Sequence, residues 1–226
     1  MRFVRNLATM IASLGLLVCL ARPAPAASVT LADLIANGGT VTSGDKVFSN
    51  FMYSSTGSMP SAHLINVIPI TQGGTFGIEF QGGFNSTAGM SPSDALIKFT
   101  VTSGAGDITG AIMRGNPLVV GAPPNGSISV TETFLPELTN TKLSIFDIQP
   151  GNVSQSMDST TFNHPVHALN VQKDILGTAV EGSVATLSFI DQLFPQDTQS
   201  VPEPASLMLV GIGALGLFGY KRFRTR

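Results

Sequence analysis

The chain has 226 residues, of which 43% are hydrophobic and 12% charged, with 24 Gly, 14 Pro, one Cys and no Trp. Soluble domains usually carry about 25% charged residues, so this composition excludes a coiled coil and a charge-rich disordered chain. Between positions 27 and 204, five basic residues stand against fourteen acidic ones, a net charge of −9, whereas both ends are purely basic. The acidic middle excludes a nucleic-acid-binding protein with a basic face.

A secretory signal peptide is predicted over residues 1–26. Two arginines open the chain, residues 7–21 form an uncharged and mostly apolar run, and Ala24 and Ala26 give the small-x-small pattern of a signal-peptidase site. A membrane-spanning helix needs about 20 apolar residues, so this shorter run favours cleavage after Ala26 over a permanent anchor. Cleavage removes Cys19, the single cysteine of the sequence, so the mature chain is expected to have no disulfide, thiol nucleophile or thiolate metal site.

Residues 27–194 are predicted to form an all-β domain, an antiparallel β-sandwich or jelly roll with one short N-terminal helix. The helix is indicated by a capping arrangement at residues 30–33, an apolar stretch at 34–36 and a stop at Gly38 and Gly39. Short alternating apolar segments, separated by turns rich in Gly, Pro and Asn, then indicate about ten strands. These segments are residues 46–53, 63–69, 75–80, 95–102, 108–113, 118–121, 127–134, 142–148, 166–171 and 182–190.

A polar linker is predicted over residues 195–200, followed by a membrane-targeting segment over residues 201–226. Residues 205–220 carry no charge and span roughly 24 Å as a helix. That length falls short of the roughly 30 Å hydrocarbon core, but the basic residues that follow can extend to the membrane surface. The positive-inside rule keeps this tail cytoplasmic and places the β-domain on the other side. The basic stop-transfer tail comprises Lys221, Arg222, Arg224 and Arg226.

The three parts of this segment follow one another in a characteristic order. Val201, Pro202, Glu203 and Pro204 precede a Gly-rich apolar helix, which precedes the Arg-rich tail. This arrangement resembles the PEP-CTERM sorting signal of Gram-negative bacteria. The resemblance implies recognition by an exosortase-type membrane protease, a transient inner-membrane intermediate, and delivery to the cell surface or to an exopolysaccharide matrix. The segments at 31–34 and 44–51 also look similar to the mature N-terminus of one PEP-CTERM group. This second resemblance does not imply any activity for the chain.

No catalytic motif is found in the β-domain, so no enzymatic activity is predicted. The G-x-S-x-G pentapeptide of many serine hydrolases is missing from the sequence. Hydrolysis of a polysaccharide by two carboxylates remains the alternative. The near absence of Trp and Tyr weighs against it, because sugars stack on aromatic rings. The eleven Phe of the β-domain are predicted to be core residues. The available glutamates are Glu79, Glu132, Glu137 and Glu181.

No metal or cofactor is predicted, although Ca²⁺ stays an alternative. His164 and His167 lie three positions apart and point to opposite faces of a straight strand, so joint ligation needs a bend and a further ligand from Asp158 or Asp174. A surface pair is the simpler interpretation. Carboxylates near turns could supply the oxygen ligands of Ca²⁺, but no EF-hand loop is found. These acids are Asp45, Asp107, Asp147 and Asp158.

The sequence thus predicts an exported bacterial surface or matrix protein with a structural or adhesive role in an exopolysaccharide or biofilm. A secreted polysaccharide hydrolase and a calcium- or sugar-binding module are the alternatives. The expected partners are signal peptidase, the Sec-type export machinery, an exosortase-type protease, the inner membrane and exopolysaccharide. Nucleic acid is not an expected partner.

Overall fold

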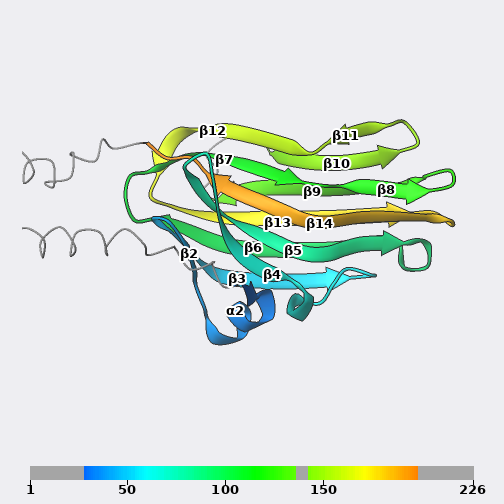
Figure 1. Ribbon diagram of the computed structural model, residues 1–226, viewed down its shortest axis with the longest axis horizontal. Coiled ribbons are helices and arrows are strands. Elements are labelled where there is room, and N and C mark those ends of the chain that lie inside the picture. The colour runs from blue at the N-terminus through cyan, green and yellow to red at the C-terminus, as the bar shows by residue number, and fades with distance from the viewer. Residues whose placement is uncertain (1–27, 136–141, 198–226) are drawn as a thin grey trace, which may run out of the picture.

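The computed structural model describes residues 28–135 and 142–197, which form two antiparallel β-sheets packed face to face (Figure 1). The predicted β-sandwich is therefore confirmed. The signal-peptide region, the segment at 136–141 and the C-terminal segment lie outside the described residues.

Sheet A contains seven strands, and its central strand β14 pairs with β5 on one side and with β7 and β8 on the other. The strand order is β1-β4-β5-β14-β7-β12, with β8 beside β14. The strands are β1 (Val29–Thr30), β4 (Asn66–Gln72), β5 (Thr75–Thr87), β7 (Ile108–Gly115), β8 (Leu118–Gly121), β12 (Met157–Val166) and β14 (Ser183–Phe194).

Sheet B also contains seven strands, in the order β11-β10-β9-β13-β6-β3-β2. Strands β13 and β14 follow one another in the chain but belong to different sheets, so their connection joins the two layers. The strands are β2 (Val41–Ser43), β3 (Lys46–Thr56), β6 (Ser93–Ser103), β9 (Gly126–Leu135), β10 (Leu143–Gln149), β11 (Val153–Gln155) and β13 (Ala168–Ala179).

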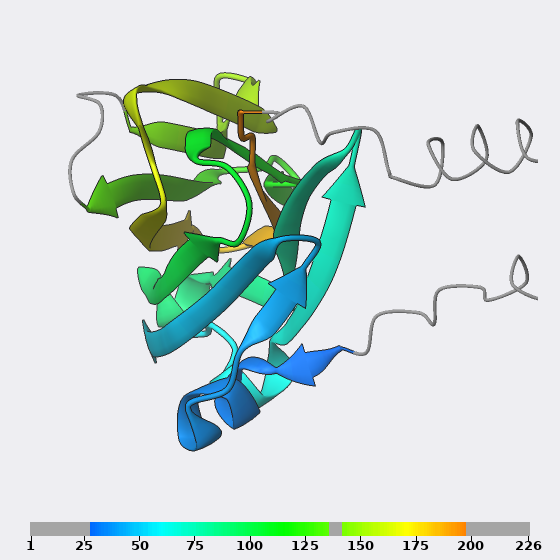
Figure 2. The ribbon, with the colours of Figure 1, turned by 90° about the vertical axis from the view of Figure 1, so that its left-hand side faces the viewer.

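Helix α2 (Leu31–Asn37) forms where the sequence predicts it. The Thr30 hydroxyl accepts a hydrogen bond from the Asp33 amide at 3.1 Å, which satisfies a free donor at the helix N-terminus. Gly38 ends the helix in the left-handed conformation (φ 58°) that glycine adopts without a steric penalty. Leu31 and Leu34 are buried against the sandwich edge, where the helix lies (Figure 2).

Each of the ten predicted strands coincides with a strand of the structure, but the prediction misses four. Strands β1, β2 and β11 have only two or three residues, too few for alternation to be visible. Strand β12 has ten residues, yet its burial does not alternate regularly and only Phe162 is buried. His63, predicted to begin a strand, lies in the short 3-10 helix η2 (Ala62–Leu64), and a second such helix, η3, spans Ala88–Met90.

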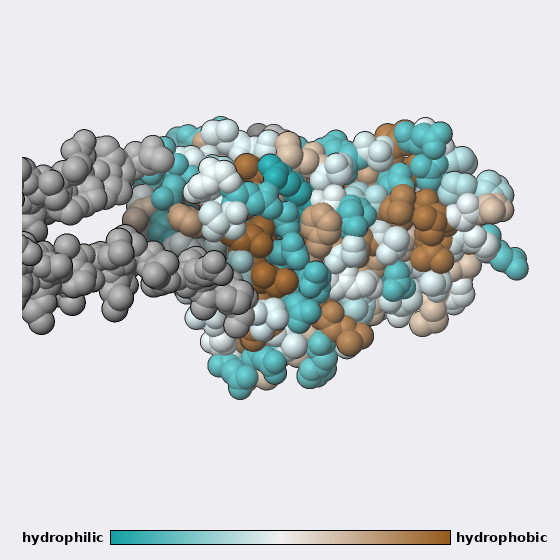
Figure 3. Space-filling view, viewed as in Figure 1, coloured by the Kyte–Doolittle hydropathy of each residue, from teal (hydrophilic) through white to brown (hydrophobic). Residues whose placement is uncertain are grey.

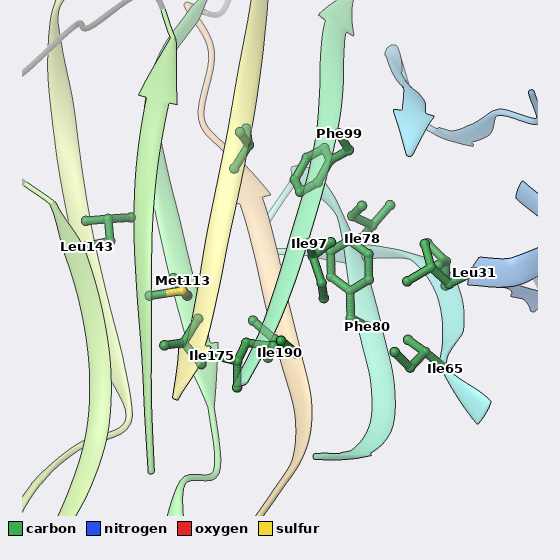
Figure 4. Close-up of a cluster of buried hydrophobic side chains, with 14 of the residues drawn as sticks. Leu31, Ile65, Ile78, Phe80, Ile97, Phe99, Met113, Leu143, Ile175 and Ile190 are labelled. Carbon is green, nitrogen blue, oxygen red and sulfur yellow. The ribbon is translucent and has the colours of Figure 1, made fainter. Parts of the chain in front are cut away.

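The core fills the space between the sheets with alternate residues of the strands (Figure 4). Ile97 and Phe99 of β6 face Ile78 and Phe80 of β5, and the Phe80 and Phe99 ring centroids are 5.6 Å apart. Eight of the eleven phenylalanines predicted to be core residues are buried. On the face seen in Figure 3, apolar residues form separate small groups between polar ones.

Candidate functional site

A shallow groove crosses the outer face of sheet B over strands β3, β6, β13 and the end of β9. It has a volume of about 300 Å³. Because successive side chains of a strand point to opposite faces, residues that alternate with the buried core positions line this groove. Polar and apolar groups both line it, and two exposed apolar side chains lie within it, Met52 and Leu135. The polar lining side chains are Asn50, Lys98, Thr100, Asn170 and Gln172.

A β-bulge positions one end of the groove. The register between β3 and β6 shifts between Ser49 and Met52, and Asn50 has a φ of 55°. Asparagine tolerates this left-handed conformation better than most residues, and a bulge redirects the side chain that it carries. The side chain of Asn50 consequently lies beside the neighbouring strand.

Hydrogen bonds connect the polar side chains across three strands. Asn50 Nδ2 donates to Thr100 Oγ1 at 3.1 Å, and Thr100 Oγ1 donates to Asn170 Oδ1 at 2.8 Å. Thr100 pairs with Asn170 in the strand register, and Lys98 pairs with Gln172 in the adjacent row. The groove therefore presents one hydrogen-bonded row of polar side chains beside a second row that contains Lys98 and Gln172.

The chemistry of this floor suits a ligand rich in hydroxyl groups. Amide side chains both donate and accept hydrogen bonds, and the Lys98 ammonium donates them and carries a positive charge. No ion pair engages Lys98 within the described ranges. Tyr53, on the same strand as Met52, is half-buried and its hydroxyl donates to the Pro60 carbonyl at 2.6 Å. Recognition here would rest on hydrogen bonds and charge, without an exposed aromatic platform.

The glutamates considered for hydrolysis do not come together. Glu79 lies on the outer face of sheet A, Glu132 is fully buried between the sheets, and Glu181 is exposed in the turn before β14. Glu137 falls outside the described residues.

Glu79 instead pairs across strands with Asp191, which sequence reasoning did not single out. Burial, together with the charge of Asp191, raises the pKa of Glu79. Asp191 Oδ2 accepts a hydrogen bond from Gln72 Nε2 at 2.9 Å, and Arg114 Nη1 donates to Gln72 Oε1. This network ties strands β4, β7 and β14 of sheet A together on the outer face of that sheet.

The residues considered for metal binding are also dispersed. His167 Nδ1 lies 3.9 Å from Asp107 Oδ1, and both side chains are exposed. His164 is exposed on β12, and the described ranges contain no group of three His, Cys, Asp or Glu residues placed to hold a metal ion.

Three of the four aspartates considered for Ca²⁺ already accept hydrogen bonds from protein groups. Asp147 Oδ2 accepts from the Val119 amide at 2.6 Å, and Asp158 Oδ2 accepts from the Ser144 amide at 2.8 Å. Asp45 accepts from Lys46 at 2.8 Å. These carboxylates hold strands and turns together.

Sequence reasoning missed the groove because each of its residues is an ordinary outward-facing strand residue. The visible signal was weak: Lys98 and Thr100 alternate with Ile97, Phe99 and Val101 in a predicted strand. What brings Asn50 and Asn170 beside them is the pairing order β3-β6-β13, which a single sequence does not display.

The predicted sorting residues lie outside the described part of the chain. This applies to the signal-peptidase site at Ala24 and Ala26, to residues 201–204 and to the basic tail at 221–226. Among residues 28–135 and 142–197, no helix has the length and apolar character needed to cross a membrane.

Comparison with known proteins identifies the C-terminal segment. Residues 200–222 match the family model of the PEP-CTERM protein-sorting motif, so the chain carries this motif where the sequence analysis expects it. The match supports an exported protein that is sorted through its C-terminus. No curated protein sequence matches the chain.

Solved structures show only a loose likeness to the sandwich. The carbohydrate-binding module TmCBM61 in complex with β-1,4-galactotriose aligns with 63% of this chain and 88% of its own, at 12% identity and a TM-score of 0.26. A family 16 carbohydrate-binding module aligns with 57% of this chain and 84% of its own, at 12% identity and 0.25. The enzymatically active domain of tailspike protein 4 from bacteriophage CBA120 aligns with 64% of this chain and 19% of its own, at 14% identity and 0.27. A structural likeness at TM-scores this low does not identify a ligand for this chain.

Proposed function

We propose that this protein is exported, processed at its C-terminal PEP-CTERM motif by an exosortase-type protease, and delivered to the cell surface or extracellular matrix. There the sandwich acts as a structural or adhesive module that binds an exopolysaccharide through the groove of sheet B. The matched motif at 200–222 supports the sorting part. The observation that carries the binding part is the hydrogen-bonded row Asn50–Thr100–Asn170 beside Lys98.

The groove favours an extended polar chain over a small apolar ligand. It is open and shallow, and it runs across paired strands, so successive units of a chain would meet successive rows of amide and hydroxyl groups. Lys98 lies in the middle of the floor, where a carboxylate of an acidic sugar would gain a charge-assisted hydrogen bond. Because residues 27–204 carry a net charge of −9, Lys98 would select a carboxylate at one position of the chain and would not favour polyanions as a class.

Binding is tested by titrating the purified full-length protein with acidic and neutral bacterial polysaccharides and measuring retention in affinity electrophoresis. We expect Lys98→Gln to weaken retention by the acidic polymers and Asn170→Ala to weaken retention by both. Equal retention of the wild type and both variants, or no retention of the wild type by any polymer, would contradict the groove as the binding site.

Sorting is tested separately, by comparing the full chain with a variant lacking residues 201–226 in membrane, cell-surface and medium fractions of the native host. The truncated protein should be distributed differently. An intact mass that shows loss of residues 1–26 and of the C-terminal segment at the surface would support processing at both ends. Unchanged delivery of the truncated protein would overturn the sorting proposal without affecting the groove.

A further inference from the structure

Three polar side chains meet in the interior of the sandwich, where the function proposed above makes no use of them. Lys173 of β13 and Glu132 of β9 are paired neighbours in sheet B, and Gln192 of β14 faces them from sheet A. All three residues are fully buried. Each has buried apolar residues two positions away on its own strand, on the same face: Val171 and Ile175, Val130 and Phe134, Ile190 and Phe194.

The contacts within this cluster are close and incomplete. Lys173 Nζ contacts Glu132 Oε2 and Gln192 Oε1, and lies 3.5 Å from the sulfur of Met113, the residue labelled in Figure 4. Glu132 Oε1 and Gln192 Nε2 are buried and have no hydrogen-bond partner. Buried polar atoms are almost always paired, so two such atoms in one cluster need an explanation.

The surroundings favour the neutral forms of the amine and the acid. Burial lowers the pKa of Lys173 and raises the pKa of Glu132, and their mutual attraction opposes both shifts. A neutral amine has a free electron pair and is a nucleophile, whereas an ammonium group is not. The carbonyl carbon of Gln192 is one bond from the oxygen that the amine contacts.

We propose that Lys173 and Gln192 form an intramolecular isopeptide bond that joins the two sheets, with Glu132 as the group that transfers protons. The three residues supply a nucleophile, an electrophilic carbonyl and a general acid–base within one water-excluded cluster. Sheets A and B would then be cross-linked at their centre.

The reaction needs no external reagent. Glu132 first takes a proton from the Lys173 ammonium, and the neutral Nζ adds to Cδ of Gln192. The resulting tetrahedral carbon carries both nitrogens. Nζ then loses a second proton and Nε2 gains one, with the Glu132 carboxyl group relaying them. The bond between Cδ and Nε2 breaks, neutral ammonia leaves, and a secondary amide between Nζ and Cδ remains. Glu132 keeps the first proton and is left as a neutral carboxylic acid. Amine plus carboxamide thus gives amide plus ammonia, with no change in oxidation state.

Formation of the bond would remove two unfavourable features of the unreacted cluster. The unpartnered Nε2 departs, and the buried ammonium becomes a neutral amide whose N–H can donate to Glu132. A buried charge is costly unless it is fully hydrogen-bonded, so this conversion stabilises the core. The bond also supplies a covalent constraint to a mature chain whose described residues contain no cysteine.

Mass spectrometry of the purified full-length protein tests the proposal. We expect its intact mass to fall short, by one ammonia molecule, of the mass calculated for the residues that the purified protein retains. A proteolytic digest should contain one branched product in which the peptide carrying Lys173 is joined to the peptide carrying Gln192. Cyclisation of an asparagine also releases ammonia, so the branched peptide is the deciding observation. Separate, unmodified peptides containing Lys173 and Gln192 would overturn the proposal.

Variants separate the roles of the three residues. Lys173→Met and Gln192→Leu should abolish the mass deficit because each removes one end of the bond. Glu132→Gln should retain both ends yet slow bond formation, leaving Lys173 open to amine-specific labelling after unfolding. Lys142→Gln, at an exposed lysine just before β10, serves as the control and should keep the deficit. If Glu132→Gln formed the branched peptide as completely as the wild type, proton transfer by Glu132 would be wrong.

Discussion

Two lysines are fully buried among residues 28–135 and 142–197, and they differ in how their charge is accommodated. Lys46 lies at the start of β3, at the end of the sandwich, whereas Lys173 lies in the middle of β13. Lys46 Nζ donates to both oxygens of Asp45, at 2.8 and 2.9 Å, and to Ser103 Oγ at 3.1 Å, and it contacts Gln196 Oε1. Lys173 contacts one carboxylate oxygen, one amide oxygen and a sulfur.

The carboxylates differ even more than the lysines. Asp45 retains 17% of its side-chain exposure and also accepts hydrogen bonds from Ser103 and the Ala105 amide, both at 3.2 Å. Burial alone would raise the pKa of Asp45, but Lys46 and these hydrogen bonds lower it on balance. Glu132 has no exposure and one unpartnered oxygen. Burial of an amine therefore does not by itself decide its chemistry. Lys46 has the partners of a stable ion pair, whereas Lys173, with fewer partners, is the lysine for which we propose a reaction.

The largest effect is expected for Lys173→Met. This change removes the proposed bond and leaves Glu132 buried without a cation, so we expect a loss of about 3–5 kcal/mol in the free energy of unfolding. Urea unfolding followed by circular dichroism measures it. A loss below about 1 kcal/mol would show that the cluster contributes little to stability.

The double variant Lys173→Met, Glu132→Leu sharpens this result. Replacing a buried ion pair by apolar residues is often neutral or stabilising, so a simple ion pair predicts a double variant at least as stable as the wild type. A cross-link predicts a deficit of about 3 kcal/mol, because the bond between β13 and β14 restricts the unfolded chain over a short loop. Recovery of full stability in the double variant would contradict the cross-link.

A smaller effect is expected for Lys46→Met. The Asp45 carboxylate keeps its hydrogen bonds and its access to solvent, so we expect a loss of about 1.5–3 kcal/mol, typical of a hydrogen bond to a charged group. The same unfolding experiment measures it, and the mass deficit of the wild type should persist in this variant. Disappearance of the deficit would assign the bond to Lys46 instead of Lys173.

Much of the fold could be predicted from the sequence because its signals are local. Alternation through Phe76, Ile78 and Phe80 marks one strand, and the Thr30 cap with Gly38 marks the helix. Strand β12 was missed because it covers the sheet edge and buries only Phe162, so alternation of burial is weak along it. Hydrophobic periodicity reveals a strand only when one face of that strand is buried.

The buried cluster could not be predicted, although part of its signal is present. Glu132 interrupts the inward-facing series Ile128, Val130 and Phe134. From the sequence alone, however, Glu132 could equally be one of the carboxylates of a hydrolase. Lys173 lies beyond the predicted end of its strand at residue 171, and the structure extends that strand to Ala179. The approach of Gln192 depends on which sheets β13 and β14 join, a long-range property.

Strong acid should remove the contribution of the Lys46–Asp45 pair to stability. Because the pKa of Asp45 is lowered by folding, its contribution is complete above the unfolded value of about 3.8 and is lost as the pH falls through the lower folded value. The difference in unfolding midpoint between the wild type and Asp45→Asn should be constant from pH 7 to pH 5 and shrink below about pH 3.8. A difference that grows in acid would reverse the assigned direction of the pKa shift.

The smallest effect on stability is expected one residue away from Lys173, on the opposite face of the same strand. Gln172→Ala changes an outward-facing side chain of the groove, so the free energy of unfolding should change by less than about 0.5 kcal/mol. Losing one hydrogen bond to a polysaccharide should weaken binding roughly 2- to 10-fold, which affinity electrophoresis measures. Gln81→Ala, an exposed glutamine on sheet A, is the matched control and should leave both quantities unchanged. Adjacent residues of β13 face the core and the solvent in turn, so Lys173 points inward and Gln172 points outward. A loss of stability in Gln172→Ala as large as that in Lys173→Met would contradict the separate roles proposed for the interior and for the groove.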